Sequence, residues 1–136
     1  MNVLLIEDDD GFRATLALAL RRRGCAVLQA AGKHEALGHV ESGSIDAIVL
    51  DAYHASEIPE HLTTPAFFAE VRRRLTRHGL CLANVYVKSD ADDAARRIAA
   101  TMAEEWPALR VLDTPGALER NTILIAGSKE IGRAHV

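Results

Sequence analysis

Short, largely apolar runs recur along the first fifty positions of the chain. They occupy residues 3–6, 26–30 and 45–50, and carboxylates follow the first and third of them at Glu7 and Asp51. Such runs are typical of strands that are buried on both faces of a parallel sheet. We therefore expect three parallel strands, the first and third of which end in acid at the same edge of the sheet.

Residues with helical spacing separate these runs. The segment from Phe12 to Gly24 carries apolar residues at i, i+4, i+7 and i+8, the spacing of one buried helix face. A second, shorter helix is expected between Gly32 and Val40. Because crossovers between parallel strands are right-handed, the strand order of this half is predicted to be 2-1-3. The predicted inner residues are Phe12, Leu16, Ala19 and Leu20 of the first helix, and Ala36, Leu37 and Val40 of the second.

The second half of the chain continues the alternation of helices and strands. Thr64 followed by Pro65 is a typical helix start, and Ser89 with Asp92 three residues later predicts another. Too few residues separate the last two apolar runs for a crossover helix, so these runs are expected to form an antiparallel hairpin. The predicted elements are a helix from Pro65 to Gly79, a strand over 80–87, a helix from Ser89 to Trp106, and strands over 109–112 and 122–126.

The complete pattern predicts one α/β domain over residues 1–129. We expect a three-layer α/β sandwich with a mainly parallel sheet in the order 2-1-3-4-6-5. The antiparallel hairpin forms its C-terminal edge. This is a flavodoxin-like or Rossmann-like fold.

Four carboxylates are expected where the strand order of the sheet reverses. Glu7, Asp8 and Asp9 follow the first strand, and Asp51 follows the third. Ligands of open α/β sheets bind at this point. Clustered carboxylates repel one another unless a cation neutralises them, and oxygen ligands suit Mg²⁺. The sequence therefore predicts a magnesium site, beside which Asp51 is placed to attack a phosphoryl donor.

Residues 1 to about 52 resemble the first half of a two-component response-regulator receiver domain. The resemblance rests on Val3-Leu-Leu-Ile-Glu-Asp-Asp9, the helix that follows, Ala30-Ala-Gly-Lys-His-Glu-Ala-Leu37 and Asp46-Ala-Ile-Val-Leu-Asp51. It implies a phosphoacceptor of phosphorelay signalling, with a sensor histidine kinase or a small phosphodonor as partner. The implied site consists of Glu7 and Asp8 as Mg²⁺ ligands, Asp51 as phosphoacceptor and metal ligand, and the main-chain carbonyl of Tyr53 as a further metal ligand.

The chain departs from the receiver pattern directly after Asp51. Ala52-Tyr-His-Ala-Ser-Glu-Ile-Pro59 stands where a receiver has Met-Pro and a nearby Gly. The expected fourth strand offers only Cys81 and Asn84 in place of the Thr or Ser that contacts the phosphoryl group, and Lys88 follows the fourth strand rather than the fifth. Impaired switching is therefore expected even if Asp51 is phosphorylated.

Residues 46–128 resemble the carboxyl half of a spermidine-synthase-like aminopropyltransferase, which has a methyltransferase-type Rossmann fold. Ile58-Pro-Glu-His-Leu-Thr-Thr-Pro-Ala-Phe-Phe68 carries most of this likeness, together with Asp46-Ala-Ile-Val-Leu-Asp-Ala-Tyr53 and Asn121-Thr-Ile-Leu-Ile-Ala126. The resemblance implies that Asp51 helps to deprotonate the attacking amine and that Tyr53 lines the substrate pocket. Decarboxylated S-adenosylmethionine would then be a substrate.

The nucleoside-binding features of that family are missing from the chain. Glu7-Asp-Asp-Asp10 stands where the family has a Gly-rich turn, and residues 26–31 contain no acid to hold a ribose. No cofactor-binding residue is therefore predicted. Because the metal-binding and acceptor carboxylates are all present, we favour the receiver function, with the aminopropyltransferase as the alternative.

The last seven residues, Glu130-Ile-Gly-Arg-Ala-His-Val136, resemble the translation of a sequencing adapter. We expect them to be an artefactual tail. Such a tail suggests a third interpretation, that the chain is a chimeric or truncated reading frame without native activity. Both families share the pattern at residues 46–51, so two halves from different genes can be joined there.

Charge, apolar segments and cysteines limit the kinds of partner and location that we expect for this protein. A formal net charge of −3 argues against binding of nucleic acid. No segment approaches the ~20 apolar residues that span a bilayer, so no membrane association is expected. Cys25 and Cys81 lack metal-ligand spacing and are expected to be free thiols in a cytoplasmic protein. The oligomeric state is left open.

Overall fold

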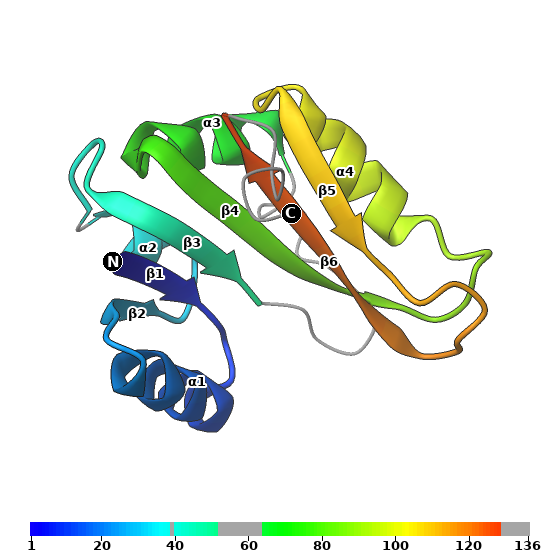
Figure 1. The fold of residues 1–136 in the computed structure, drawn as a ribbon, viewed down its shortest axis with the longest axis horizontal. Helices are drawn as coiled ribbons and strands as arrows, with labels where there is room; N and C mark the ends of the chain where they lie inside the picture. Colours follow the sequence, from blue (N-terminus) through cyan, green and yellow to red (C-terminus); the bar gives the residue numbers. More distant parts are fainter. Residues whose placement is uncertain (39, 52–63, 129–136) are drawn as a thin grey trace.

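A six-stranded sheet forms the centre of the protein (Figure 1). The computed structural model describes residues 1–38, 40–51 and 64–128. Its strand order, β2-β1-β3-β4-β6-β5, confirms the predicted order. The strands are β1 (Asn2–Ile6), β2 (Ala26–Ala30), β3 (Ile45–Leu50), β4 (Leu75–Val87), β5 (Ala108–Leu112) and β6 (Arg120–Gly127). The helices are α1 (Asp10–Arg22), α2 (Lys33–Gly38), α3 (Pro65–Arg74) and α4 (Ala94–Ala103).

The strand directions also confirm the prediction. β1 pairs in parallel with both β2 and β3, and β3 pairs in parallel with β4. β6 lies antiparallel between β4 and β5, so the last two strands form the edge hairpin. The carboxyl ends of β1 and β3 consequently meet at one edge of the sheet.

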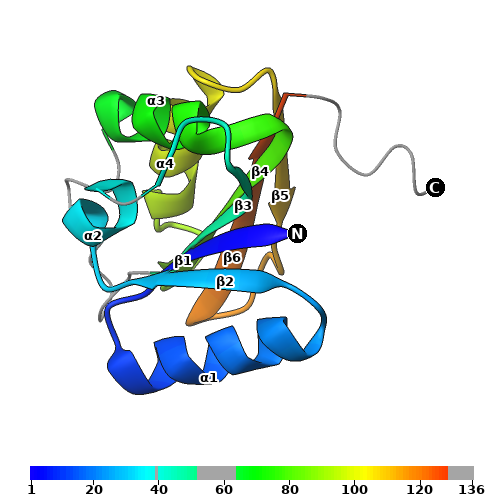
Figure 2. The same cartoon turned by 90° about the vertical axis from the view of Figure 1, so that its left-hand side faces the viewer.

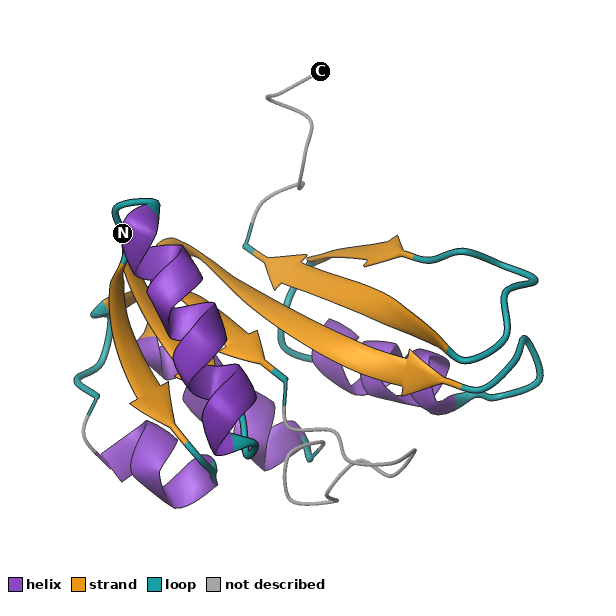
Figure 3. Ribbon diagram, turned by 90° about the horizontal axis from the view of Figure 1, so that it is seen from below, coloured by secondary structure: helices purple, strands orange, loops and turns teal. Residues whose placement is uncertain are grey.

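The helices are divided unequally between the two faces of the sheet. Helices α2, α3 and α4 gather on one face, whereas α1 packs on the other face against β1 and β2 (Figure 2). Within the described part of the chain, no helix covers β4, β6 and β5 on the α1 side (Figure 3). The half-buried side chains on this open part of the sheet include Leu80, Leu82, Ile123 and Ile125.

Most of the hydrophobic core lies between the sheet and helices α2 to α4. Phe67 and Phe68 of α3 are fully buried, and their rings meet edge to face with centroids 5.4 Å apart. The ring of Phe68 also lies 6.0 Å from that of Trp106, which follows α4 and is 3% exposed. Trp106 therefore anchors the segment after α4 against α3.

The buried face of α1 differs from the predicted one. Phe12 is 51% exposed and Ala19 is exposed, whereas Ala17 is fully buried and Leu16 and Leu20 pack beside it. On a helical projection Phe12 and Ala19 lie roughly 90° or more from the centre of this face. The prediction was right for Leu16 and Leu20 and wrong for Phe12 and Ala19, and it omitted Ala17, whose small side chain allows the helix to pack closely on β1 and β2.

The boundary between α3 and β4 also corrects the prediction. The helix ends at Arg74 rather than Gly79, and β4 begins at Leu75. Between the β3–β4 pairs Ile45–Leu75 and Ala47–Leu80 the register shifts, so residues 76–79 of β4 leave the regular ladder. Gly79 permits this excursion, because a Cβ there would lie 3.0 Å from the Leu75 side chain.

Helix α4 begins later than predicted. Its first residue is Ala94, and Ser89 instead accepts the Ala91 N–H in the preceding turn. Asp92 accepts the N–H groups of both Lys88 and Ala94 through its carboxylate, each at 3.0 Å. These bonds lower the pKa of Asp92 and occupy the residue that was expected to complete a capping box with Ser89.

The start of α3 confirms the prediction and offers a test of local stability. The Thr64 hydroxyl accepts the Phe67 N–H at 3.1 Å, and Pro65 is the first helical residue. We expect Thr64→Ala to lower the free energy of unfolding by about 1 kcal/mol, measured by urea denaturation. Thr15→Ala, inside the exposed part of α1, serves as the control and should change stability by less than ~0.5 kcal/mol. An equal effect of the two substitutions would show that the cap adds nothing.

Some predicted features lie outside the described residues. Tyr53 and the expected tail at 130–136 belong to this group, so their predicted roles stay predictions. Cys25 and Cys81 are free thiols, and burial raises the pKa of Cys81 to about 12. Among the described helices, none is long and apolar enough to cross a membrane.

Candidate functional site

Two predicted site residues come together at the carboxyl edge of the sheet. Glu7 follows β1, and its N–H donates to the Ala30 carbonyl at 3.0 Å. Asp51 follows β3, and its N–H donates to the Ile6 carbonyl at 2.8 Å. Both bonds extend the parallel ladder by one step, which fixes the backbone from which the two carboxylates project.

Glu7 is a buried carboxyl, only 6% exposed. Its Oε1 accepts the Asp9 N–H at 3.0 Å. Burial first, and then the nearby Asp51 and Asp8, together raise the pKa of Glu7 from 4.5 to about 7 against the opposing effect of the Asp9 N–H. Near neutral pH, Glu7 therefore exchanges a proton at little cost in free energy.

Asp51 is held by a residue from the neighbouring strand. The side-chain Nδ2 of Asn84 in β4 donates to Asp51 Oδ1 at 3.1 Å. The carboxylate can only accept, so this contact sets the orientation of the amide. Asn84 Oδ1 then points away from Asp51. It is buried, and among the described residues it has no hydrogen-bond donor.

Asn84 was not predicted to be a site residue. A buried acceptor without a donor costs roughly 1–3 kcal/mol, so such atoms are uncommon and often mark a ligand position. In the sequence, one indication of its role was a polar amide within the otherwise largely apolar run Leu80-Cys-Leu-Ala-Asn-Val-Tyr-Val87. Its contact with Asp51 depends on the β3–β4 register, which pairs Leu50 with Ala83.

The other carboxylates of the first turn have local partners. Asp9 caps α1 by accepting the Phe12 N–H at 2.7 Å, and Asp10 pairs with Arg13 at 2.6 Å. Arg13 also donates to the Glu7 carbonyl at 2.8 Å. Asp8 is half-buried beside Glu7, and its charge contributes to the raised pKa of that residue. The turn after β1 is thus braced by its own side chains.

The predicted Mg²⁺ site stays a prediction. Over residues 1–38, 40–51 and 64–128, no group of three or more His, Cys, Asp or Glu side chains is arranged to hold a metal ion. Glu7, Asp8 and Asp51 are neighbours, as their effect on the Glu7 pKa requires. The fourth proposed ligand, the Tyr53 carbonyl, lies outside the described residues.

A second polar cluster lies near the turn between β5 and β6 and is paired internally. Arg120 bonds to both carboxylate oxygens of Asp113, at 2.7 and 3.2 Å, and to Asp90 at 2.9 Å. Thr122 donates to Asp113 at 2.8 Å. Arg120 first, and Thr122 next, lower the pKa of Asp113 to about 2. These groups satisfy one another and hold the hairpin, so the acidic site at β1 and β3 is the better functional candidate.

Comparison with solved structures identifies the fold. A probable spermidine synthase from Corynebacterium glutamicum superposes with a TM-score of 0.69 and 21% identity, covering 99% of this chain and 59% of its own. The spermidine synthase from Thermotoga maritima gives a TM-score of 0.62 at 15% identity, covering 94% and 54%. The fold is that of Rossmann-like methyltransferases. An S-adenosylmethionine-dependent methyltransferase from Archaeoglobus fulgidus shares it, with a TM-score of 0.62, 9% identity and coverage of 93% and 85%.

Sequence-based comparisons add nothing to this result. The chain matches no known family model and no curated protein. It spans less than two thirds of the length of the two spermidine synthases. The methyltransferase-type fold covers nearly the whole chain, including the half that resembles a receiver.

Proposed function

We propose that this chain is a domain of the spermidine-synthase type whose carboxyl-edge site binds a cationic amine. The observation that carries the proposal is the pair formed by Asp51 and Asn84, which combines a negative charge with a buried acceptor that has no donor within the described ranges. The likeness of the fold to solved spermidine synthases supports the same class of ligand.

The chemistry of the three side chains fits an alkylammonium group. An ammonium offers N–H donors only, which matches the acceptor Asn84 Oδ1 and the carboxylate of Asp51. The charge of Asp51 would offset the cost of removing the ammonium from water. An amine must lose a proton before it attacks carbon, and Glu7, with a pKa raised to about 7, is suited to receive it.

The turn after β1 and the end of β2 do not fit a nucleoside, the part of decarboxylated S-adenosylmethionine that these positions would have to bind. In the turn after β1, the Asp9 N–H is bonded to Glu7 and the Phe12 N–H to Asp9, so carboxylates already occupy these donors. β2 ends in Gln29 and Ala30, without an acid for a ribose. We therefore propose amine binding without detectable aminopropyl transfer by this chain.

Titration calorimetry with putrescine at pH 7 tests the proposal. The wild type should bind, and Asp51→Asn should weaken binding by about 10- to 100-fold because a charged hydrogen-bond acceptor is lost. Asp10→Asn is the matched control, since it removes the same charge from a carboxylate that pairs with Arg13 at the surface. Failure of the wild type to bind, or equal weakening in both variants, would reject a specific amine site.

Transfer is measured separately. The protein is incubated with putrescine and decarboxylated S-adenosylmethionine, and methylthioadenosine is sought by mass spectrometry. We expect none above a control without protein. Product that depends on Asp51 would show that the chain accepts the nucleoside in spite of the turn after β1.

A Mg²⁺-dependent phosphoacceptor is the second candidate, because Glu7, Asp8 and Asp51 are neighbouring carboxylates at the predicted position. Acetyl phosphate with Mg²⁺ should then add a base-labile phosphoryl group that is absent from Asp51→Ala. Phosphorylation of the wild type without putrescine binding would favour this candidate over the amine-binding one.

A further inference from the structure

A cavity lies at the opposite edge of the sheet from Glu7 and Asp51. It has a volume of about 390 Å³ and opens beside the first residues of β4. This volume falls within the range of small-molecule sites, roughly 300–1,000 Å³. The side chains that matter for its chemistry are those of Arg72, Thr76, Arg77, His78, Trp106 and Ser128.

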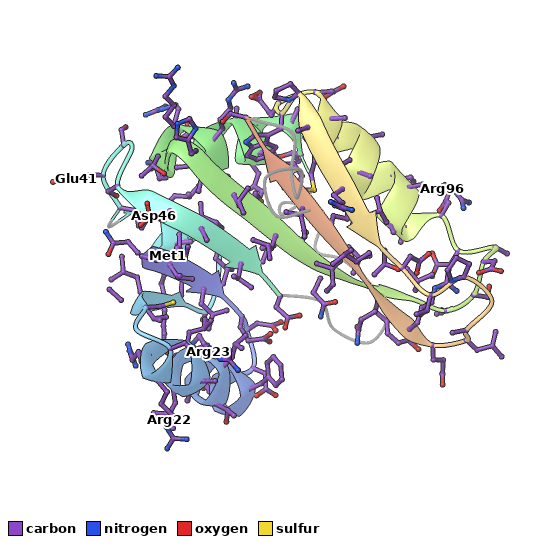
Figure 4. All side chains as sticks on the ribbon, viewed as in Figure 1. Met1, Arg22, Arg23, Glu41, Asp46 and Arg96 are labelled. Carbon is purple, nitrogen blue, oxygen red and sulfur yellow. The ribbon has the colours of Figure 1, made fainter. Side chains whose placement is uncertain are left out.

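The backbone around this cavity is held in place at several points. The Ser128 hydroxyl donates to the Arg77 carbonyl at 2.5 Å, and the Thr76 hydroxyl lies 3.5 Å from Asp46 Oδ1. Asp46 also accepts the Asn2 N–H at 2.7 Å, close to Met1 at this edge (Figure 4). Together with the absence of a Cβ at Gly79, these contacts define the excursion of residues 76–79 that forms one wall.

The cavity has an excess of positive charge. At the end of α3, Arg73 and Arg74 both pair with Glu70. Arg72 instead donates to the Glu105 carbonyl, and its charge has no carboxylate partner among the residues that the structure describes. Arg77 likewise forms no ion pair with any carboxylate in the described ranges, although it lines the same cavity.

We propose that this cavity binds the phosphate group of a small phosphorylated metabolite. Two guanidinium groups present planar sets of N–H donors that match phosphate oxygens. His78 adds a ring nitrogen, Thr76 adds a hydroxyl, and Leu75 provides an apolar wall for the rest of the ligand. The anion site lies on the other edge of the sheet from the proposed amine site and does not depend on it.

The test uses the full chain and two matched substitutions. Binding of inorganic phosphate and of glycerol phosphate is measured by titration calorimetry at constant ionic strength. Arg77→Gln should weaken binding by about 10- to 100-fold, because a charged donor is lost. Its fold should be retained, since the structural bond at residue 77 uses the backbone carbonyl. Arg73→Gln removes the same charge from a residue paired with Glu70 and should leave affinity unchanged.

Comparing the affinities for inorganic phosphate and glycerol phosphate distinguishes a site for free phosphate from a site for a phosphorylated metabolite. Tighter binding of glycerol phosphate than of inorganic phosphate supports a phosphorylated metabolite, whereas equal affinities reduce the site to one for free phosphate and overturn the proposed ligand. Absence of binding by the wild type, or equal loss in Arg73→Gln and Arg77→Gln, overturns the site itself. Melting curves of each variant confirm that lost binding does not reflect unfolding.

Discussion

Replacing Phe68 with alanine is expected to lower the free energy of unfolding by about 3–5 kcal/mol. Its side chain is fully buried and joins α3 to the segment after α4 through its contact with Trp106. The substitution removes this bridge and leaves a cavity beneath the helix layer. Domains of this size are stable by roughly 5–15 kcal/mol, so the variant should unfold at much lower urea concentration.

Phe12→Ala makes the same chemical change where the side chain is 51% exposed. This control should cost well under half as much as Phe68→Ala, because less apolar surface returns to water. The comparison also tests the corrected face of α1. A loss in Phe12→Ala comparable to that in Phe68→Ala would mean that Phe12 is packed, contrary to the structure.

The strand order could be predicted because it depends on rules that act over short stretches of chain. Apolar runs before Glu7 and Asp51 mark buried strands, and right-handed crossovers place the first and third side by side. Once this order holds, both carboxylates must reach the same edge. The convergence of Glu7 and Asp51 therefore followed from sequence, whereas the ligand of that edge did not.

The errors at element boundaries come from contacts between distant residues. The end of α3 depends on how Gly79 packs against Leu75 after β4 has joined β3, which no local propensity contains. The start of α4 depends on Asp92, which bonds to the N–H groups on both sides of it instead of completing a box with Ser89. In both cases tertiary structure selected one of several locally acceptable turns.

The sequence could not separate the receiver function from the aminopropyltransferase function, because the two families share the segment that ends in the key residue Asp51. The segment Asp46-Ala-Ile-Val-Leu-Asp51 resembles the corresponding strand of receivers and also that of aminopropyltransferases. The added information is the position of Asn84, whose amide nitrogen reaches Asp51 from the next strand and whose amide oxygen has no donor in the part of the chain that the structure describes. That arrangement favours a ligand that donates hydrogen bonds.

Glu7→Gln is expected to remove a large pH dependence of stability. The pKa of Glu7 is raised from 4.5 to about 7 in the folded protein, so this carboxyl stabilises the fold below pH 4.5 relative to higher pH. That contribution is lost as pH rises from 4.5 through about 7. In this range the folded state still binds the proton, whereas the unfolded state has lost it, so rising pH favours the unfolded state. Between pH 5 and pH 8 the loss should amount to about 2–3 kcal/mol.

Glutamine keeps the shape of the side chain and can still accept the Asp9 N–H, but it does not ionise. Urea denaturation in the presence of a chelator should therefore find Glu7→Gln more stable than the wild type at pH 8 and nearly equal to it at pH 5. Glu104→Gln, at an exposed position, provides the control. If the difference between wild type and Glu7→Gln is the same at both pH values, Glu7 is not a buried carboxyl with a raised pKa. Putrescine adds a link to function, because an ammonium bound beside Asp51 should favour the charged form of Glu7 and restore stability to the wild type at pH 8.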